Sequence, residues 1–457
     1  MTTDRFGMAT STANDAALRD FEEATFAIAA HKPGVADSLA RALEKEPQFV
    51  AAHALLGFAN VLLARVETIS IGRDCLARAR RALASAGGSE GERAMVDALA
   101  LSVSGGLNAG ADRLDAHLVD HPECFIAAKL AHSLRFMSGD ALGMLTSVDR
   151  TLVALPKDHP GHGFTLGCRA FALEELGAYD AAERLGREAV DFEPEDSWAI
   201  HAIGHVHEMT GRAADGLTWI ESRRATWTHC NNFALHMSWH AALFQLELGR
   251  IAHVLDLYDR EIWPSASDDF RDMSNAVALL ARVEQFGVDV GRRWAGPAEI
   301  AARRAKDTTL TFAALHNLVA LVASGNLAEA RELALALEAP GAKGDDQEEV
   351  RARVGRPLAR AMLDMAGKKA APIDFARVLR DLPKIGGSNA QRDVFTRQLA
   401  RMAAERRDAA ALETVLAARR TLKREDSFVA LTRARFQAAE TRDEAPVAAT
   451  SAIRLTA

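Results

Sequence analysis

Residues 163–196, GFTLGCRAFALEELGAYDAAERLGREAVDFEPED, contain two amphipathic segments separated by Gly177 and followed by Pro194. In each segment, small and apolar residues recur three or four positions apart, which is the period of a helix packed on one side. Glycine is favoured where one helix ends and the chain reverses, because a left-handed backbone conformation costs it little. The stretch therefore predicts two antiparallel helices joined by a tight turn.

The same two marks recur along the chain with one period. Prolines that follow helical runs are 75, 34 and 38 residues apart, at Pro47, Pro122, Pro156 and Pro194. Glycines are spaced 38, 34, 38, 38 and 38 residues apart, at Gly139, Gly177, Gly211, Gly249, Gly287 and Gly325. Such spacing is typical of tetratricopeptide repeats, whose expected residues are present at Leu166, Ala170, Gly177, Tyr179, Ala182, Ala189 and Pro194.

This pattern predicts an all-α fold, an α-solenoid formed as a right-handed superhelix of about ten TPR-like helix pairs with a C-terminal helical cap. The array covers residues 16–384, with units at roughly 16–50, 51–87, 91–124, 125–160, 161–196, 197–230, 231–268, 269–306, 307–340 and 348–384. Residues 385–437 are expected to form capping helices, and residues 1–15 and 438–457 to be disordered tails.

The composition argues against several classes of function. A net charge of −7 and a pI near 6.1 leave no broad basic surface, so no nucleic-acid partner is expected. Four separated cysteines without a C-x-x-C pair suit a reducing cytoplasm. No signal peptide or membrane-length apolar run is found, so no membrane partner is expected. Because the sequence has no phosphate-binding glycine loop, no nucleotide cofactor is expected.

Six of the 15 histidines fall between residues 198 and 240. His201, His205 and Glu208 lie four and three positions apart, so they should share one face of a helix. His236 and His240 should share a face of the next unit's first helix in the same way. Because the first helices of stacked pairs line the concave side and are neighbours there, the two faces should meet in one pocket.

Neighbouring first helices add further polar residues to this predicted pocket, and tryptophans could form its walls. The residues expected to bind substrate are Trp198, Trp239, Asn232, Asp272, Asn275, Arg282, His316 and Arg169. A unit that merely stacks would carry alanine and leucine at such positions, since buried polar groups are costly without a purpose. By contrast, the charged run RRTLKRED at 419–426 is expected to be a solvated helix end.

Several interpretations of the cluster remain open. His201, His205, Glu208, His236 and His240 could hold a divalent transition metal such as zinc, manganese, iron or nickel. Without a metal, Glu208, His205 and His240 could act as general acids and bases. Cys230 could be a nucleophile if the following helix favours its thiolate. Alternatively, the histidines are only hydrogen-bonded across helix seams.

Four runs resemble the tetratricopeptide repeat protein 38 family: AFALEELGAYDAAER (170–184), DSWAIHAIGHVHEM (196–209), THCNNFALHMSWH (228–240) and LYDREIWP (257–264). The family name describes an architecture and implies no reaction. The resemblance implies importance for Trp198, His201, His205, His207, Glu208, Cys230, His236, Trp239 and His240, with weaker matches at Asp272, Arg282 and His316.

The sequence therefore predicts a cytoplasmic protein whose concave pocket binds a small molecule. The pocket is expected to transform this ligand by hydrolysis or proton transfer, with a divalent metal in the site. The alternative is a non-catalytic scaffold that binds a peptide or partner protein in its concave groove. A homodimer is possible in either case, since the edge of a repeat array can pair with its copy.

Overall fold

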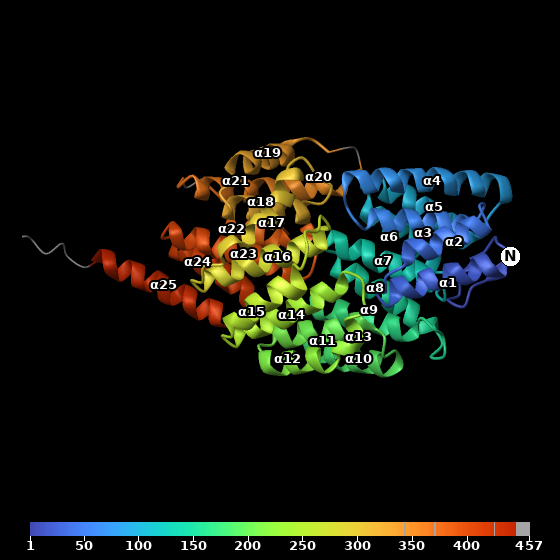
Figure 1. Ribbon diagram of the computed structural model, residues 1–457, viewed down its shortest axis with the longest axis horizontal. Helices are drawn as coiled ribbons and strands as arrows, with labels where there is room; N and C mark the ends of the chain where they lie inside the picture. The colour runs from blue at the N-terminus through green and yellow to red at the C-terminus, as the bar shows by residue number, and fades with distance from the viewer. Residues whose placement is uncertain (342–343, 370–371, 425, 445–457) are drawn as a thin grey trace, which may run out of the picture.

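The computed structural model describes residues 1–341, 344–369, 372–424 and 426–444, and within them the chain is helical apart from two short strands (Figure 1). The helices pack in neighbouring pairs, as in an α-solenoid. Successive pairs fall within the predicted units: α1 (Asp15–Ala29) and α2 (Val35–Lys45), α3 (Val50–Val61) and α4 (Val66–Ala86), α5 (Glu90–Ser102) and α6 (Leu107–Leu118), α7 (Phe125–Ser138) and α8 (Ala141–Ala154), α9 (His162–Glu175) and α10 (Tyr179–Phe192), and α11 (Ser197–Met209) and α12 (Ala213–Ser222).

The second half of the array is less regular. After the short α13 (Arg224–Trp227), the pairs are α14 (Phe233–Glu247) with α15 (Ile251–Leu257), α16 (Phe270–Gln285) with α17 (Ala295–Arg303), and α18 (Thr311–Ala323) with α19 (Leu327–Glu338). The π-helix η1 (Tyr258–Ile262) follows α15, and the 3-10 helix η2 (Gly291–Trp294) lies between α16 and α17. The C-terminal part comprises α20 (Asp346–Val350), η3 (Arg351–Gly355), α21 (Arg356–Ala366), α22 (Phe375–Asp381), η4 (Leu382–Ile385), α23 (Asn389–Glu405), α24 (Ala409–Arg420) and α25 (Ser427–Glu444).

The turns of the repeat have the backbone conformation that their glycines predict. All six spaced glycines have a positive φ between 72° and 84°, namely Gly139, Gly177, Gly211, Gly249, Gly287 and Gly325. Other L-residues rarely adopt this left-handed region, so glycine ends the first helix of each of these pairs at low cost.

The first helices of the middle pairs are buried on every side, whereas the second helices are buried on one side. Every residue of α11 is buried, while α10 buries only Ala182, Leu185, Gly186 and Ala189. A helix that is covered all round needs neighbours on both faces. The second helices cover the outer face, so other elements must cover the inner one.

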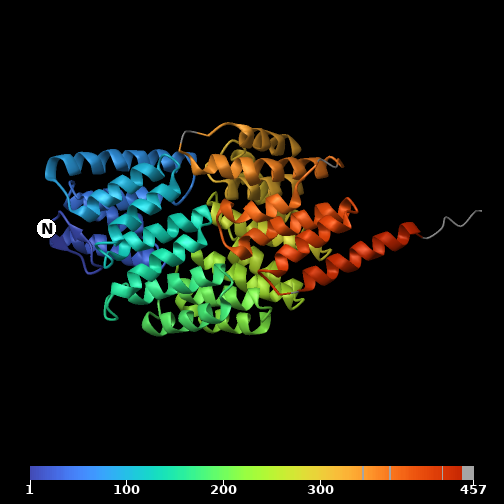
Figure 2. The same cartoon turned by 180° about the vertical axis from the view of Figure 1, so that it is seen from behind.

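Helix α23 is one of these elements. The backbone nitrogen of Asn389 donates to Glu175 of α9 (2.7 Å), and the ring of Phe395 lies 4.7 Å from that of His316 on α18. The guanidinium of Arg282 on α16 donates to the carbonyl of Ala390 (2.6 Å). Figure 2 shows α23 and its neighbours, in red, in front of the green and yellow helices. Helix α23 was expected to cap the end of the array. Instead, it lies across the inner face of the middle pairs, because most of its surface is apolar or ion-paired.

The two ends of the array also touch. Arg65, before α4, pairs with Asp268, and Arg304, after α17, pairs with the same carboxylate. Further along, the backbone nitrogen of Asp346 donates to the carbonyl of Gly105 (3.1 Å). Figure 1 shows the blue N-terminal pairs beside the orange α20. The superhelix is therefore curled far enough for distant units to meet.

The N-terminal residues are ordered, so the prediction of a disordered tail over 1–15 is wrong. Strands β1 (Thr2–Thr3) and β2 (Ala9–Thr10) pair antiparallel. Burial alternates along the segment, with Phe6 and Met8 each only 1% exposed. This alternation is the period of a strand, and the ring of Phe6 packs 5.6 Å from that of Phe125.

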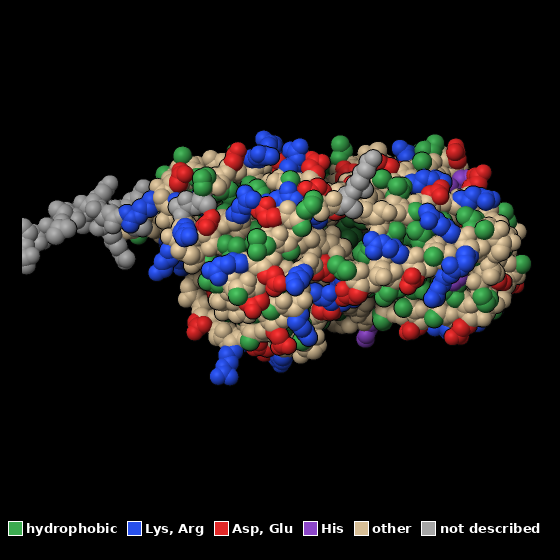
Figure 3. All heavy atoms as spheres, turned by 90° about the horizontal axis from the view of Figure 1, so that it is seen from above, with side chains coloured by type: hydrophobic (Ala, Val, Ile, Leu, Met, Phe, Trp, Pro, Cys, Tyr) green, Lys and Arg blue, Asp and Glu red, His purple; other side chains and the backbone are tan. Residues whose placement is uncertain are grey.

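Acidic and basic side chains are mixed over the face of the molecule shown in Figure 3. A search of the described residues finds no helix long and apolar enough to cross a bilayer. Of the predicted C-terminal tail, residues 438–444 belong to α25, and residues 445–457 lie outside the described part of the chain.

Candidate metal centre

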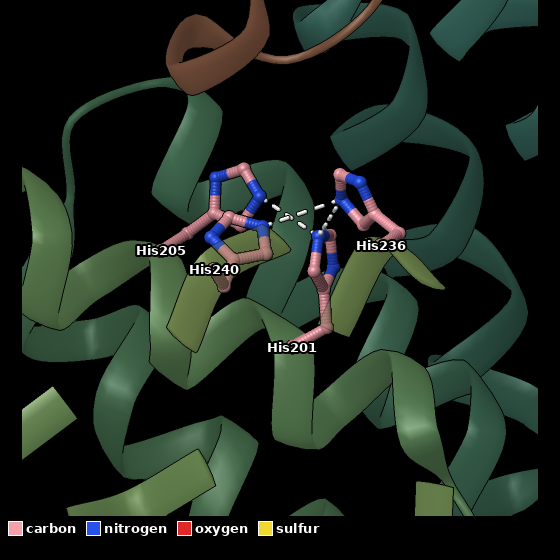
Figure 4. Close-up of side chains that lie close together, drawn as sticks. All are labelled: His201, His205, His236 and His240. Carbon is pink, nitrogen blue, oxygen red and sulfur yellow. Dashed lines mark hydrogen bonds between the residues drawn. The ribbon is translucent and has the colours of Figure 1, made fainter. Parts of the chain in front are cut away.

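Two neighbouring first helices, α11 and α14, carry the histidine cluster. Asp196 caps α11 by accepting from the backbone nitrogens of Trp198 and Ala199, which fixes where the helix begins. His201 and His205 follow one helical turn apart, and His236 and His240 have the same spacing on α14. Figure 4 shows the four rings pointing toward one another from the two helices.

The four imidazoles meet through their Nε2 atoms. The Nε2 of His201 lies 2.8 Å from that of His205 and 2.9 Å from that of His236, and the Nε2 of His240 lies 3.2 Å from that of His236. One nitrogen from each ring falls within 4.8 Å of all the others. No ring is more than 8% exposed. The cluster could therefore hold a metal ion in a buried site.

An oxygen atom lies beside the Nδ1 of three of the rings, as a hydrogen-bond partner for His236 and as a longer contact without a hydrogen bond for His205 and His240. The contacts are His236 Nδ1 with Asn275 Oδ1 (2.8 Å), His205 Nδ1 with Glu174 Oε2 (3.5 Å) and His240 Nδ1 with Glu208 Oε2 (3.4 Å). An oxygen acceptor favours a proton on Nδ1, which leaves a lone pair on Nε2. Three lone pairs then face one point, where a proton on the Nε2 of His201 can bond to only one of them and a cation can bond to all three.

Burial keeps His201, His205 and His236 in the neutral form that binds metals. Burial, followed by the neighbouring imidazoles, lowers the pKa of His201 well below its ordinary value. Burial also lowers the pKa of His205 well below that value, and it lowers the pKa of His236 to about 3. A neutral imidazole has a free lone pair at any pH above its pKa.

Glu208 lies beside the cluster as a carboxylate, outside the group of four nitrogens that converge. Burial alone would raise the pKa of Glu208, but the Nζ of Lys423 at 3.3 Å and the ring of His240 outweigh burial and hold this pKa far below its usual range. Glu208 was predicted to be a metal ligand or an acid-base group, and the structure places it between His240 and Lys423. Its expected role as a metal ligand has no support in the geometry.

Glu174 and Lys423 are site residues that the sequence analysis missed. Glu174 comes from α9 and reaches His205, while Lys423 comes from the C-terminal segment and reaches Glu208. Lys423 is in the charged run at 419–426, which was expected to be solvated; instead, Arg419 and Lys423 are 4% and 6% exposed. The unusual density of opposite charges in that run was the available signal for a buried ion-pair network.

A cavity of about 370 Å³ adjoins the cluster on the Glu208 side. Its lining combines apolar and charged side chains, including Leu243, Phe244, Glu208, Arg282, Arg397 and Lys423. Arg282 is 2% exposed and donates to the carbonyls of Ala278 (3.0 Å) and Ala390 (2.6 Å), and burial lowers its pKa to about 10. Arg282 therefore lies where the sequence analysis expected a ligand-binding residue.

The two predicted wall residues contact the cluster directly. The indole of Trp198 lies 4.8 Å from the ring of His201, and that of Trp239 stacks on His236 at 5.2 Å between centroids. Asn275 also contacts the cluster through His236. These three residues hold the imidazoles in place by packing and hydrogen bonding.

Four other predicted residues bond to groups outside the cluster. Asn232 donates to Asp272 (3.1 Å), whose pKa burial raises to about 6. The Nδ1 of His316 bonds to the carbonyl of Phe312 one turn earlier on the same helix (2.8 Å). Arg169 forms an ion pair with Asp149 on α8 at 2.5 Å and is partly exposed. Its predicted role in holding substrate stays a prediction.

Cys230 is not an activated thiolate. Its Sγ lies 3.1 Å from the Oγ of Ser197 and 3.7 Å from the carbonyl of Ala30. Burial raises the pKa of the thiol, and the hydrogen bond from Ser197 only partly offsets this. The nearby Lys32 also lowers this pKa, but burial outweighs it, so the thiol form is favoured.

No protein-family model matches the chain. The resemblance to the tetratricopeptide repeat protein 38 family therefore stays a prediction from sequence. The geometry of α11 and α14 determines which chemistry the site can support.

Proposed function

We propose that the protein is a metal-dependent enzyme that acts on a small molecule. In this proposal His201, His205, His236 and His240 hold one divalent transition metal ion, and the cavity beside Glu208 receives the substrate. The reaction class is hydrolysis or proton transfer, for which a bound ion supplies Lewis acidity and a more acidic water.

The observation that carries the proposal is the convergence of four Nε2 atoms in a fully buried site. Acceptors on Nδ1 direct three of the lone pairs to a common point. If the site served only to pack two helices, a proton on the Nε2 of His201 could bond to one neighbouring ring, and the remaining Nε2 lone pairs would still repel one another. An ion bonded at about 2.0–2.1 Å to each nitrogen would remove that repulsion at nearly the same spacing.

The identity of the ion determines whether the site can be catalytic. Zinc in protein sites is generally four-coordinate, so four histidines would saturate it and leave no position for water or substrate. Manganese, iron and nickel accept up to about six ligands and would keep positions open. Catalysis therefore favours one of these ions, or zinc with one of the four rings displaced.

Glu208 connects the ion site to the cavity. One of its oxygens faces the Nδ1 of His240, and the other faces Lys423. The strongly lowered pKa makes it a weak base at neutral pH, so we assign it to orienting His240 and a donor group of the substrate. Arg282 and Lys423 provide positive charge on the wall of the same cavity.

A scaffold that binds a peptide in its concave groove is the alternative function. Its groove would have to be free, yet α23 lies against α9, α16 and α18 on that face. An extended peptide would have to displace a helix with an almost wholly buried surface. This arrangement favours a small ligand over a peptide.

Metal analysis by inductively coupled plasma mass spectrometry tests the proposal. Wild-type protein should carry a transition metal ion, and a His201→Ala/His236→Ala double variant should lose it while keeping its helical circular-dichroism spectrum. A His207→Ala variant is the matched control, because His207 is on the same helix but outside the cluster. Wild-type protein that binds no metal, even after reconstitution, would refute the proposal.

A further inference from the structure

Two buried carboxylates flank the histidine cluster in equivalent positions but in unequal electrostatic surroundings. Each faces the Nδ1 of one histidine, Glu208 that of His240 at 3.4 Å and Glu174 that of His205 at 3.5 Å. Glu208 is balanced by the ammonium of Lys423. Among the described residues, no lysine or arginine forms an ion pair with Glu174.

Glu174 is 0% exposed, so water cannot satisfy it from outside. Neither of its oxygens has a hydrogen-bond partner within the described part of the chain. An ionised carboxylate without partners is rarely kept in a buried position, and burial together with the nearby Glu175 and Glu208 raises the pKa of Glu174 well above its ordinary value, so its carboxyl group is neutral in the metal-free protein. Because no lysine or arginine of the described residues pairs with Glu174, the position beside it favours a cation.

Suitable donors surround this position. Glu174, Glu175 and His205 each offer one ligand atom, and these atoms lie within 4.8 Å of one another. Two ligands of one ion are at most about 4 Å apart when the bonds are 2.0–2.2 Å long, so small side-chain movements suffice. Carboxylate and imidazole donors together suit zinc, manganese or iron.

Glu175 can take part without losing its present contacts. One oxygen accepts from the backbone nitrogen of Asn389 (2.7 Å) and the other from the guanidinium of Arg392 (2.8 Å). An ionised carboxylate has about four acceptor sites, so each oxygen keeps one free. The contacts with α23 would then hold this ligand in place.

We propose a second divalent metal site formed by Glu174, Glu175 and the Nδ1 of His205, with the His205 imidazole bridging two ions. The Nε2 of His205 faces the four-histidine cluster, and its Nδ1 faces the carboxylates on the opposite side of the ring. When the second ion binds, the Nδ1 proton of His205 and the carboxyl proton of Glu174 leave to solvent, so His205 bridges the two ions as an imidazolate. This inference rests on the proposed function, because His205 serves both ions.

Binding stoichiometry tests the second site. Metal-free protein is dialysed against Mn²⁺, or in a parallel set against Zn²⁺, and the bound ion is measured by mass spectrometry. Wild type should bind about two equivalents and Glu174→Gln about one, because the amide offers the ion a weaker, neutral ligand. Glu188→Gln is the matched control and should keep about two, since this exposed carboxylate of α10 belongs to neither group of ligand atoms.

Thermal unfolding gives an independent measurement in case a variant binds poorly for structural reasons. In chelator, Glu174→Gln should unfold at about the same temperature as wild type, because a neutral amide of similar shape replaces a carboxyl group that is neutral in the metal-free protein. With the ion added, wild type should gain more stability than this variant.

The outcomes separate the two proposals. About one equivalent in wild type that Glu174→Gln retains would overturn the second site and leave the four-histidine site intact. Two equivalents that persist in Glu174→Gln would also overturn it. Protein that binds no ion at all would overturn both the second site and the proposed function.

Discussion

Replacing Lys423 with methionine should destabilise the protein more than neutralising its partner Glu208. The two side chains are 7% and 4% exposed and lie 3.3 Å apart. Lys423→Met leaves a buried carboxylate whose remaining partner is His240 at 3.4 Å. Removing one member of a buried ion pair typically costs about 3–5 kcal/mol.

The reverse substitution leaves a smaller imbalance. In Glu208→Gln, Lys423 keeps Asp426 at 3.6 Å, so we expect a loss of about 1–3 kcal/mol. In the double variant neither charge remains unpaired. Combining the two changes should therefore recover about 1–3 kcal/mol relative to the sum of the single losses.

Thermal unfolding in chelator measures this double-mutant cycle without any contribution from bound metal. The expected order of unfolding temperature is wild type, then Glu208→Gln, with Lys423→Met lowest and the double variant above Lys423→Met. Circular dichroism of each variant before heating controls for misfolding. Strictly additive losses would refute the view that Lys423 is present to balance Glu208.

Two further predictions concern the histidine rings and α23. His236 has a pKa of about 3 in the fold and about 6.5 when unfolded, so the unfolded state takes up the proton first and the metal-free protein loses stability as pH falls from 6.5 towards 3. For one ring, the free energy of unfolding changes by at most about 1.4 kcal/mol per pH unit. His236→Phe should reduce this pH dependence, measured by thermal unfolding at pH 6.5 and 4.5. An unchanged pH dependence would contradict the lowered pKa of His236. Phe395→Ala should cost about 3–5 kcal/mol because the ring is fully buried on α23. In limited proteolysis, this variant should be cut near α23 earlier than a Leu335→Ala control. Leu335 is 72% exposed, so its replacement should lower the free energy of unfolding by no more than about 0.5 kcal/mol. Equal cleavage of the two variants would count against the role of α23.

The repeat was predictable because its signals are local. Gly177 and its five counterparts each end a helix with a positive φ. The regular spacing of these glycines therefore marks the helix ends in the sequence itself. The histidine cluster was predictable for a related reason. Four residues on two adjacent first helices converge once the helix period and the repeat period are both known.

The partners of the cluster depend on contacts between distant parts of the chain. Glu174 and Glu175 lie in the run LEELG, where a solvated helix end is the ordinary expectation, but Glu175 bonds to Asn389 and Arg392 of α23, more than 200 residues later. Lys423 is in a charged run that pairs with other helices. Lys423 itself pairs with Glu208, and Arg419 pairs with Asp393. Charge pairing of this kind leaves no period in the sequence.

The N-terminal ribbon shows a different reason for failure. Alternating burial at Asp4, Phe6, Met8 and Thr10 is a strand pattern, but only two of these residues are apolar. The sequence signal was therefore weak, and the packing of Phe6 on Phe125 determines the outcome.

The position of α23 has a consequence for the order of events during synthesis. The residues of the cluster leave the ribosome well before the helix that covers them, with about 180 residues between Glu208 and Asn389. At typical translation rates this interval lasts roughly 10–40 s. During that time the inner face of the nascent array is open to small solutes, and it closes once the later helix docks. We therefore expect ions to load most readily on the growing chain and to exchange slowly from the finished protein.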